Sequence, residues 1–235
     1  MVGDPASEHR WVVDPIDGTV NFTYGIPHAC VSIALQGRRP KPRSSRREEA
    51  LTPICNLQSA LRNRREPPHV GCSSRERGSK SQPASDADYE TLVGVVFDPF
   101  CDELFTAVRG QAAKVNGRQV RVSSRRRLDE AIISVGFAKT RASLNQMLPG
   151  FKRLVHRVRK IRIMGAAALS LAYVAAGRMD AYVESGLRLW DIAAGGLLIE
   201  CAGGDFFHEP VAGGRHTYRI LANNGLLRKP LAKLV

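Results

Sequence analysis

A short stretch near the N-terminus restricts the local fold more than any other part of the chain. The apolar run Trp11-Val12-Val13 leads directly into Asp14-Pro15-Ile16-Asp17-Gly18-Thr19-Val20-Asn21-Phe22. Because Pro15 and Gly18 disfavour regular helix, both carboxylates are expected at the end of a strand. Irregular backbone at a strand end can turn side-chain and main-chain oxygens toward one ligand.

The residue types in this stretch are those that bind a divalent cation and a phosphate group. Asp14, Asp17 and the carbonyl of Ile16 offer the oxygen ligands that hard cations prefer. The Gly18 amide and the Thr19 amide and hydroxyl can donate hydrogen bonds to a phosphate. Asp-Pro and Asp-Gly also occur in ordinary turns. On these residues alone, a turn and a ligand site remain open alternatives.

Length and composition narrow the class of protein. The 235 residues, 43% of them hydrophobic, suffice for one sizeable core or two small ones. No apolar run approaches the ~20 residues that span a bilayer. The N-terminal residues lack the pattern of a secretory signal, so we expect a cytoplasmic or organellar location. Five scattered cysteines without a CxxC pair favour free thiols in a reducing compartment.

The positive charge is concentrated in one segment of unusual composition. Residues 37–86 hold 12 Lys and Arg against 5 Asp and Glu, a net +7 of the total +13. This segment is rich in Arg, Ser and Pro and is expected to be a disordered insertion at a hairpin tip. Either a genuine loop or a gene-model artefact explains it. We favour the artefact, and peptides from 43–80 in the native protein would contradict it. Gly37–Ser85 contains no Phe, Tyr or Trp, so base stacking and a specific nucleic-acid partner are not expected.

Apolar patterns along the rest of the chain predict alternating strands and helices in layers with a mixed sheet. Asn116-Gly117 predicts a tight hairpin turn. A helix is expected over 144–159, with Pro149 starting its firm portion. The expected strands are 29–36, 91–97, 103–108, 131–135, 161–163, 179–183, 205–207 and 218–222, and further helices are expected over 166–176, 190–201 and 226–235.

Asp191 is the other acidic residue that requires an explanation. It lies at the start of an apolar, Ala- and Gly-rich segment, where a buried carboxylate must meet a cation or cap the helix. Taken alone, the position favours a helix N-cap. The six histidines do not cluster at ligand spacing, and the chain contains no P-loop and no GxSxG motif.

Two blocks together resemble a known family. Residues 11–22 resemble the first signature of the inositol monophosphatase family, and Leu189-Trp190-Asp191-Ile192-Ala193-Ala194-Gly195 resembles the second. The resemblance covers about 8–36 and 91–228. It leaves out 37–86 and the N-terminal portion of the family. It implies one layered α/β domain over 1–235, of the αβαβα type without its N-terminal helices.

The resemblance also implies a function and a set of site residues. The family comprises Mg²⁺-dependent, lithium-sensitive phosphatases of inositol metabolism, in which metal-activated water hydrolyses inositol monophosphate. By motif position, the catalytic residues are Asp14, Asp17, Thr19 and Asp191, and the metal ligands are Asp14, Ile16, Asp17 and Asp191. The phosphate and substrate contacts are Gly18, Thr19, Gly165, Ala166, Ala167 and Glu184. Ala166 departs from the Thr or Ser of many members, and Glu184 could instead be a solvated residue after a strand.

One family element is not found in the sequence. A Gly-Glu-Glu element, which supplies a further metal ligand, would lie upstream of Met1, and neither Asp4 nor Glu8 matches it. We therefore expect weaker metal binding and exposed apolar surface. An impaired member acting through binding, or a phosphatase for histidinol phosphate or for a sugar or nucleotide bisphosphate, remains an alternative. The expected partner is a small phosphorylated substrate, without a membrane, in a homodimer if the fold is complete.

Overall fold

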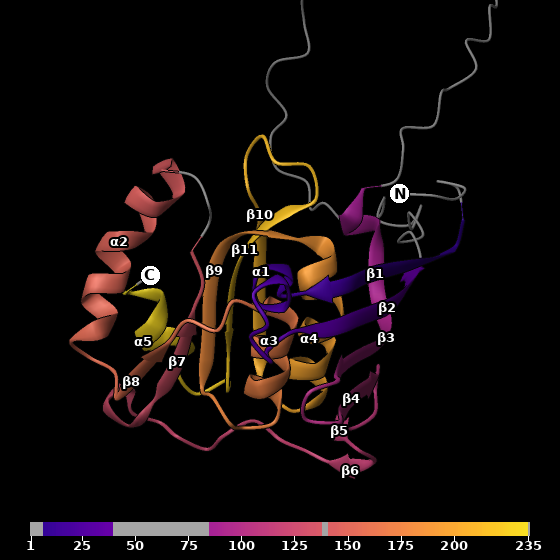
Figure 1. Ribbon diagram of the computed structural model, residues 1–235, viewed down its shortest axis with the longest axis horizontal. Coiled ribbons are helices and arrows are strands. Elements are labelled where there is room, and N and C mark those ends of the chain that lie inside the picture. Colours follow the sequence, from indigo (N-terminus) through magenta and orange to yellow (C-terminus); the bar gives the residue numbers. More distant parts are fainter. Residues whose placement is uncertain (1–6, 40–84, 138–140, 235) are drawn as a thin grey trace, which may run out of the picture.

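The computed structural model describes residues 7–39, 85–137 and 141–234, which form two β-sheets and five α-helices (Figure 1). The first sheet is antiparallel and has the strand order β1-β2-β3-β4-β5-β6. Its strands are β1 (His9–Asp17), β2 (Cys30–Arg38), β3 (Tyr89–Asp98), β4 (Glu103–Val108), β5 (Lys114–Val115) and β6 (Arg118–Gln119). The second sheet is mixed and has the order β10-β11-β9-β7-β8. Its strands are β10 (Asp205–Pro210), β11 (Thr217–Asn223), β9 (Ala181–Arg188), β7 (Ile132–Val135) and β8 (Lys160–Arg162).

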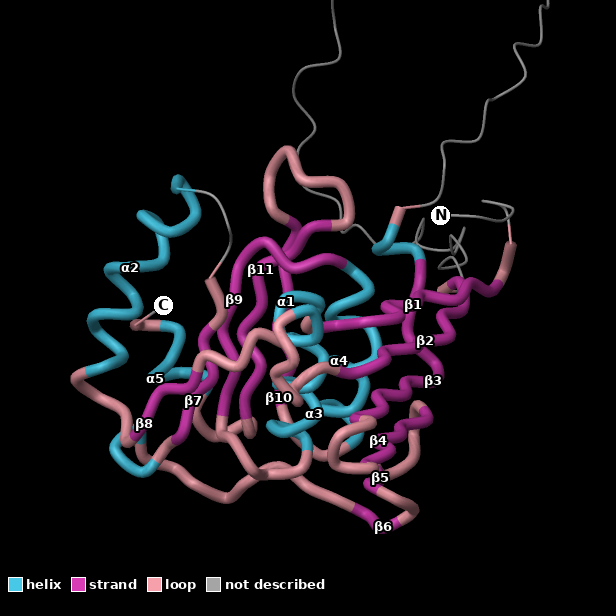
Figure 2. The backbone as a smooth tube through the Cα atoms, in the orientation of Figure 1, coloured by secondary structure: helices cyan, strands magenta, loops and turns pink. Residues whose placement is uncertain are grey.

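Helices separate the two sheets and cover the far side of the second one (Figures 1 and 2). The inner layer is α3 (Ala167–Ala175) with α4 (Leu189–Cys201), and the outer layer is α2 (Arg141–Val155) with α5 (Arg228–Ala232). The described residues thus form layers in the order sheet, helices, sheet, helices. This arrangement confirms the predicted αβαβα layering without its N-terminal helices, and the mixed sheet expected from the apolar patterns is the second of the two sheets.

The central helix α4 is apolar on all sides because it lies between the two sheets. Glycines allow the close approach that this position requires. A side chain at Gly94 of β3 would meet the backbone of Ala194 at 2.8 Å, and one at Gly195 would meet Leu171 of α3 at 2.5 Å. The main hydrophobic cluster therefore includes both inner helices and side chains from both sheets.

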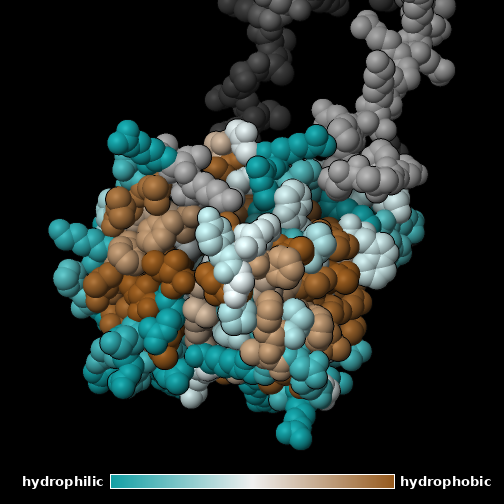
Figure 3. Space-filling model, viewed as in Figure 1, coloured by the Kyte–Doolittle hydropathy of each residue, from teal (hydrophilic) through white to brown (hydrophobic). Residues whose placement is uncertain are grey.

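The other face of the first sheet is apolar but has no helix against it among the described residues. The side chains of this face alternate with those that contact α4 and are half-buried or exposed: Trp11, Val13, Val31, Ile33, Leu35, Val93, Val95, Phe97 and Leu104. Figure 3 shows hydrophobic residues at the surface over this part of the molecule. We name this set of side chains the open face.

The predicted hairpin between β2 and β3 is present. The two strands pair antiparallel up to Arg38 and Tyr89, and the Arg39 N–H donates to the carbonyl of Asp88 at 2.8 Å. Strand β2 therefore extends two residues into the segment that was expected to be disordered from residue 37. The expected disorder over 40–84 falls outside the described residues.

One local prediction was wrong, and one short helix was not predicted. Pro149 lies inside α2 rather than at its start, and the helix begins at Arg141. Met147, which precedes the proline, packs against the second hydrophobic cluster, so tertiary contact holds the first turns in place. The second difference is α1 (Thr19–Thr23), a five-residue helix that follows directly after Gly18. Within the described residues, no helix combines the length and apolar character needed to cross a bilayer.

Candidate metal centre

A β-bulge in β1 brings the two acids of the first motif to the same site. Asp14 pairs with Ser32 and Asp17 pairs with Cys30, so three steps along β1 match two along β2. Residues three apart in a regular strand point to opposite faces, and the extra residue of a bulge reverses this. The three-residue spacing of the two acids is thus accommodated by an irregular strand.

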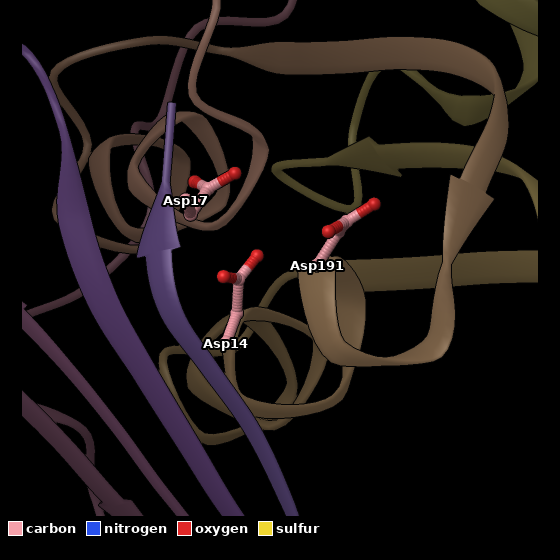
Figure 4. A group of neighbouring side chains, drawn as sticks. All are labelled: Asp14, Asp17 and Asp191. Carbon is pink, nitrogen blue, oxygen red and sulfur yellow. The ribbon is translucent and has the colours of Figure 1, made fainter. Parts of the chain in front are cut away.

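The third acid joins them from α4. One carboxylate oxygen from each of Asp14, Asp17 and Asp191 lies within 4.8 Å of the other two, and the three side chains surround one space (Figure 4). Asp191 is not the N-cap that its position favoured. It is the third residue of α4 and accepts a hydrogen bond from the Arg188 N–H at 2.7 Å through Oδ2. The same carboxylate can therefore hold the helix start and contribute an oxygen to the site.

Burial and charge repulsion raise the pKa values of Asp17 and Asp191. Burial is the main cause that raises the pKa of Asp17 to about 6, and the charge of Asp14 adds to it. Burial likewise raises the pKa of Asp191 to about 7, with contributions from the charges of Asp17 and Asp14. A divalent cation would relieve both the repulsion and the burial of charge, so this donor set fits one.

Asp17 also connects the first motif to the start of α3. The Ala167 N–H donates to its Oδ1 at 3.1 Å and the Ala168 N–H to its Oδ2 at 2.7 Å. The buried Cys30 thiol lies 3.5 Å from the same Oδ2, and burial raises the pKa of that thiol. The Ala167 amide, which was expected to contact substrate, thus holds an acidic side chain of the site in place.

Asn21 fixes the turn that precedes α3. Its Nδ2 donates to the carbonyls of His28 and Met164, both at 2.8 Å. Gly165, in a left-handed conformation with φ of +78°, lies so close that a side chain there would meet Asn21 at 3.0 Å. The Asn21 side-chain amide therefore links the first motif to the turn before α3, although these two segments are far apart in the sequence.

Gly18 is required by the same close approach. Its φ is +86°, and a side chain there would meet the His28 carbonyl at 3.0 Å and the Ala166 methyl at 3.1 Å. Ala166 is buried against this glycine at the N-cap of α3. A side chain at Gly18 would therefore push β1 away from α3.

Thr19 and Glu184 lie at the edges of the acidic group. The Thr19 hydroxyl donates to the Ile16 carbonyl at 2.8 Å, so its oxygen can still accept a hydrogen bond. Glu184 on β9 is half-buried, and its Oε2 accepts a hydrogen bond from the Tyr182 hydroxyl. Burial raises the pKa of Glu184 to about 7, the Tyr182 hydrogen bond opposes that rise, and the charge of Asp17 adds to it. Glu184 is therefore not a freely solvated side chain.

Sequence reasoning did not identify several residues that shape the site. Asn21 lies inside the motif, but its two acceptors are 7 and 143 positions away. The Tyr182 hydroxyl acts through Glu184 on the same strand, and the Ala168 amide acts through Asp17 on a distant segment. Alternation along β9 could have placed Tyr182 and Glu184 on the same face of the strand. No local signal indicates the Ala168 contact.

Comparison with known proteins agrees with this geometry. The chain matches the model of the inositol monophosphatase family over residues 3–42 and 87–232. It is 37% identical to the Nus factor SuhB of Pasteurella multocida over 84% of this chain and 56% of that protein. It is 34% identical to the inositol-1-monophosphatase of Mesorhizobium japonicum over 97% of this chain and 68% of that protein. The inositol monophosphatase structure from Anabaena superposes with a TM-score of 0.72 at 30% identity, covering 99% of this chain and 73% of that one.

The fold and the acidic group define a layered α/β protein with a cation-binding donor set where the first sheet meets the inner helices. The chain belongs to the inositol monophosphatase family. The family model does not match residues 43–86. The resemblance found in the sequence likewise left out residues 37–86. The chain spans just over half the length of the Pasteurella relative.

Proposed function

We propose that this protein hydrolyses small phosphate monoesters with the help of Mg²⁺, and that inositol monophosphate is its substrate. The observation that carries the proposal is the convergence of Asp14, Asp17 and Asp191 on one space within 4.8 Å. Mg²⁺ takes oxygen ligands, usually one or two carboxylates together with substrate phosphate oxygens. The Ile16 carbonyl adds a further oxygen next to the two motif acids.

The residues around the acids have separate roles in this proposal. When bound, the cation lowers the pKa of a water and neutralises charge on the phosphoryl oxygens. The Thr19 oxygen, whose proton is directed to the Ile16 carbonyl, accepts a hydrogen bond from that water and orients it. The Gly18 and Thr19 amides contact the phosphate, together with the Gly165-Ala166 turn. Glu184 accepts a hydrogen bond from a hydroxyl of the substrate and so favours a polyol.

The same proposal covers assembly and location. Large side chains at and just after the end of the first motif are exposed, with Phe22 at 52% and Tyr24 at 80%, which supports a homodimer formed through this region. The three described cysteines, Cys30, Cys101 and Cys201, are free thiols, which supports a reducing compartment such as the cytoplasm or an organelle.

Release of phosphate from inositol-1-phosphate tests the proposal. We expect Mg²⁺-dependent release that lithium inhibits, and we expect Asp191→Asn to lower it by about a hundredfold or more, beyond the 10- to 100-fold typical of residues that only support a ligand. The asparagine keeps an oxygen for the Arg188 N–H, so the metal-free protein should stay folded. Asp102→Asn is the matched control, because Asp102 is exposed in a turn with a φ of +53°, a conformation that asparagine tolerates.

Alternative substrates and a binding role give different results in the same assay. Release from histidinol phosphate or a bisphosphate but not from inositol-1-phosphate would keep the chemistry and change the substrate. Mg²⁺ binding, detected through the fluorescence of Trp190 beside Asp191, without release from any ester would favour a member that acts through binding. Equal activity of the Asp191→Asn and Asp102→Asn variants would contradict the proposed centre.

A further inference from the structure

The charge of the described residues is concentrated in one part of the fold. Residues 118–137 and 141–162 contain 12 Arg and Lys against Asp129 and Glu130, a net charge of +10. The other described residues contain 12 Arg and Lys against 15 Asp and Glu, a net charge of −3. The net charge of +6 that lies outside the 37–86 segment is therefore concentrated in one region of the fold.

The fold brings the two halves of this charged region together. The Arg159 N–H donates to the carbonyls of Leu128 and Ala131 at 3.3 and 3.1 Å, so the chain after α2 lies against the segment before β7. Strand β8 then runs parallel to β7, with Lys160 opposite Ile132. We name the resulting surface the basic edge; its side chains are Arg125, Arg126, Arg127, Arg157, Arg159 and Lys160.

Most of these side chains are available to a partner. Arg126, Arg157, Arg159 and Lys160 are exposed, and within the described chain none of them forms an ion pair. Arg125 binds the buried Asp180 and lines, with Glu130, Ile132 and Arg159, a surface depression of about 360 Å³. Arg127 is paired with Asp129 and Glu130. Figure 3 shows hydrophilic residues along this lower left part of the molecule, over β8 and the segment that leads to β7.

The basic edge and the metal centre lie at opposite ends of β7. Ile132, at the start of β7, pairs with Lys160, whereas Gly136, just past the end of β7, packs against the Glu184 carboxylate. Four residues of strand separate these ends by ~13 Å. The charges of the basic edge are therefore not contacts for the phosphate of a substrate at the metal centre.

The residue types of the basic edge indicate which kind of anionic partner it binds. Five of its six cations are arginines, whose planar groups form paired hydrogen bonds with phosphate oxygens. Val155 and Ile163 flank the edge and are 47% and 62% exposed, but the described residues of 118–137 and 155–163 include no exposed Trp, Phe or Leu, the side chains that typically insert into a lipid surface. No exposed Phe, Tyr or Trp lies there either, and His156 is the one exposed ring among these described residues, so a platform for stacking on single-stranded bases is not supported. We propose that the basic edge binds the phosphate backbone of a nucleic-acid duplex without reading its sequence.

The test compares two variants that change the net charge by the same amount. Arg157→Glu with Lys160→Glu removes two cations of the basic edge, and Lys114→Glu with Arg215→Glu removes two exposed cations elsewhere. Both are made in the full chain, so any contribution of the basic 37–86 segment is common to them. Binding to a fluorescent RNA duplex, a DNA duplex and anionic phosphatidylglycerol vesicles is measured between about 50 and about 200 mM salt.

We expect the unmodified protein to bind a duplex with an affinity that falls steeply with salt. The basic-edge variant should bind at least about tenfold more weakly at low salt, with its salt slope reduced by about 2, or about 1 for each phosphate that the variant no longer neutralises. The control variant should bind less than about twofold more weakly, and phosphatase activity, where present, should be equal in all three proteins. Equal weakening in both variants, binding to vesicles but not to duplexes, or no binding at low salt would each overturn the proposal.

Discussion

The two sheets of this protein share one helix layer but differ in what lies on their outer faces. The outer face of the second sheet is covered by α2 and α5, whose Leu154 and Leu231 are almost fully buried. The outer face of the first sheet carries Trp11 and Val13, which are 66% and 48% exposed. Both sheets are covered by α3 and α4 on the inside.

This difference shows that strand composition and burial are separate properties. Strands β2 and β3 have apolar residues on both faces, a pattern typical of a sheet that is covered on both sides. On the inner face these residues are buried, and on the open face they remain accessible to solvent. The sequence-based expectation of exposed apolar surface is thus located on one specific face of one sheet.

The largest expected effect compares neighbouring residues on opposite faces of β4. Phe105 is fully buried against the inner helices, whereas Leu104 on the open face is 41% exposed. We expect Phe105→Ala to lower the free energy of unfolding by about 3–5 kcal/mol and Leu104→Ala by about 1 kcal/mol or less. Urea unfolding of both variants measures the difference.

An equal loss of unfolding free energy in Phe105→Ala and Leu104→Ala would contradict the difference between the two faces. Such a result would mean that the open face is covered in solution, by a second copy or by another segment. Repeating the Leu104→Ala measurement over a range of protein concentrations distinguishes these cases, because only association makes stability depend on concentration.

Local pattern predicted the elements well where one face of each is buried. The strand over 103–108 was predicted with its observed bounds, and the Asn116-Gly117 turn has φ values of +47° and +78°, as its dipeptide requires. The helix start predicted at Pro149 was wrong because packing of Met147 against the second hydrophobic cluster holds the turns before the proline in helical form. Local rules therefore hold for contacts within a few residues and fail where a distant element decides.

The site was predictable in its residue types but not in its geometry. Two acids and a later Asp-helix motif could be found by inspection, and the family resemblance linked them. The bulge that aligns Asp14 with Asp17 depends on pairing with β2, and the support from Asn21 depends on Met164. The clustering of charge at the basic edge also required the topology, since 118–131 and 156–162 meet only in the folded chain.

A second prediction concerns the metal centre as a link between the first sheet and the inner helices. The raised pKa values of Asp17 and Asp191, about 6 and about 7, mean that the metal-free folded protein holds protons more tightly than the unfolded chain. These groups therefore stabilise the fold fully below their ordinary pKa values, and that contribution is lost as pH rises through about 6–7. A cation needs the deprotonated acids, so its effect has the opposite sign.

We expect the stabilisation by Mg²⁺ to grow from near zero at about pH 5 to about 2.7 kcal/mol at about pH 8, for a concentration about 100 times the dissociation constant. Thermal unfolding with and without MgCl₂, at matched ionic strength, measures it. The Asp191→Asn variant should lose most of this gain at the higher pH. A stabilisation that is independent of pH, or retained in the variant, would place the cation elsewhere.

The prediction with the smallest expected effect tests whether the segment between β2 and β3 covers the open face. Replacing residues 40–84 by a linker of about four residues shortens the loop more than tenfold, which as a loop-closure effect raises the free energy of unfolding by about 2 kcal/mol. The Arg39–Asp88 hydrogen bond already closes the hairpin at 2.8 Å, so β2 and β3 should keep their register. In this shortened protein, Phe105→Ala should cost as much as in the full chain, because the inner face is unchanged. A loss of stability on shortening, together with a larger effect of Leu104→Ala in the full chain than in the shortened one, would identify 40–84 as a cover for the open face.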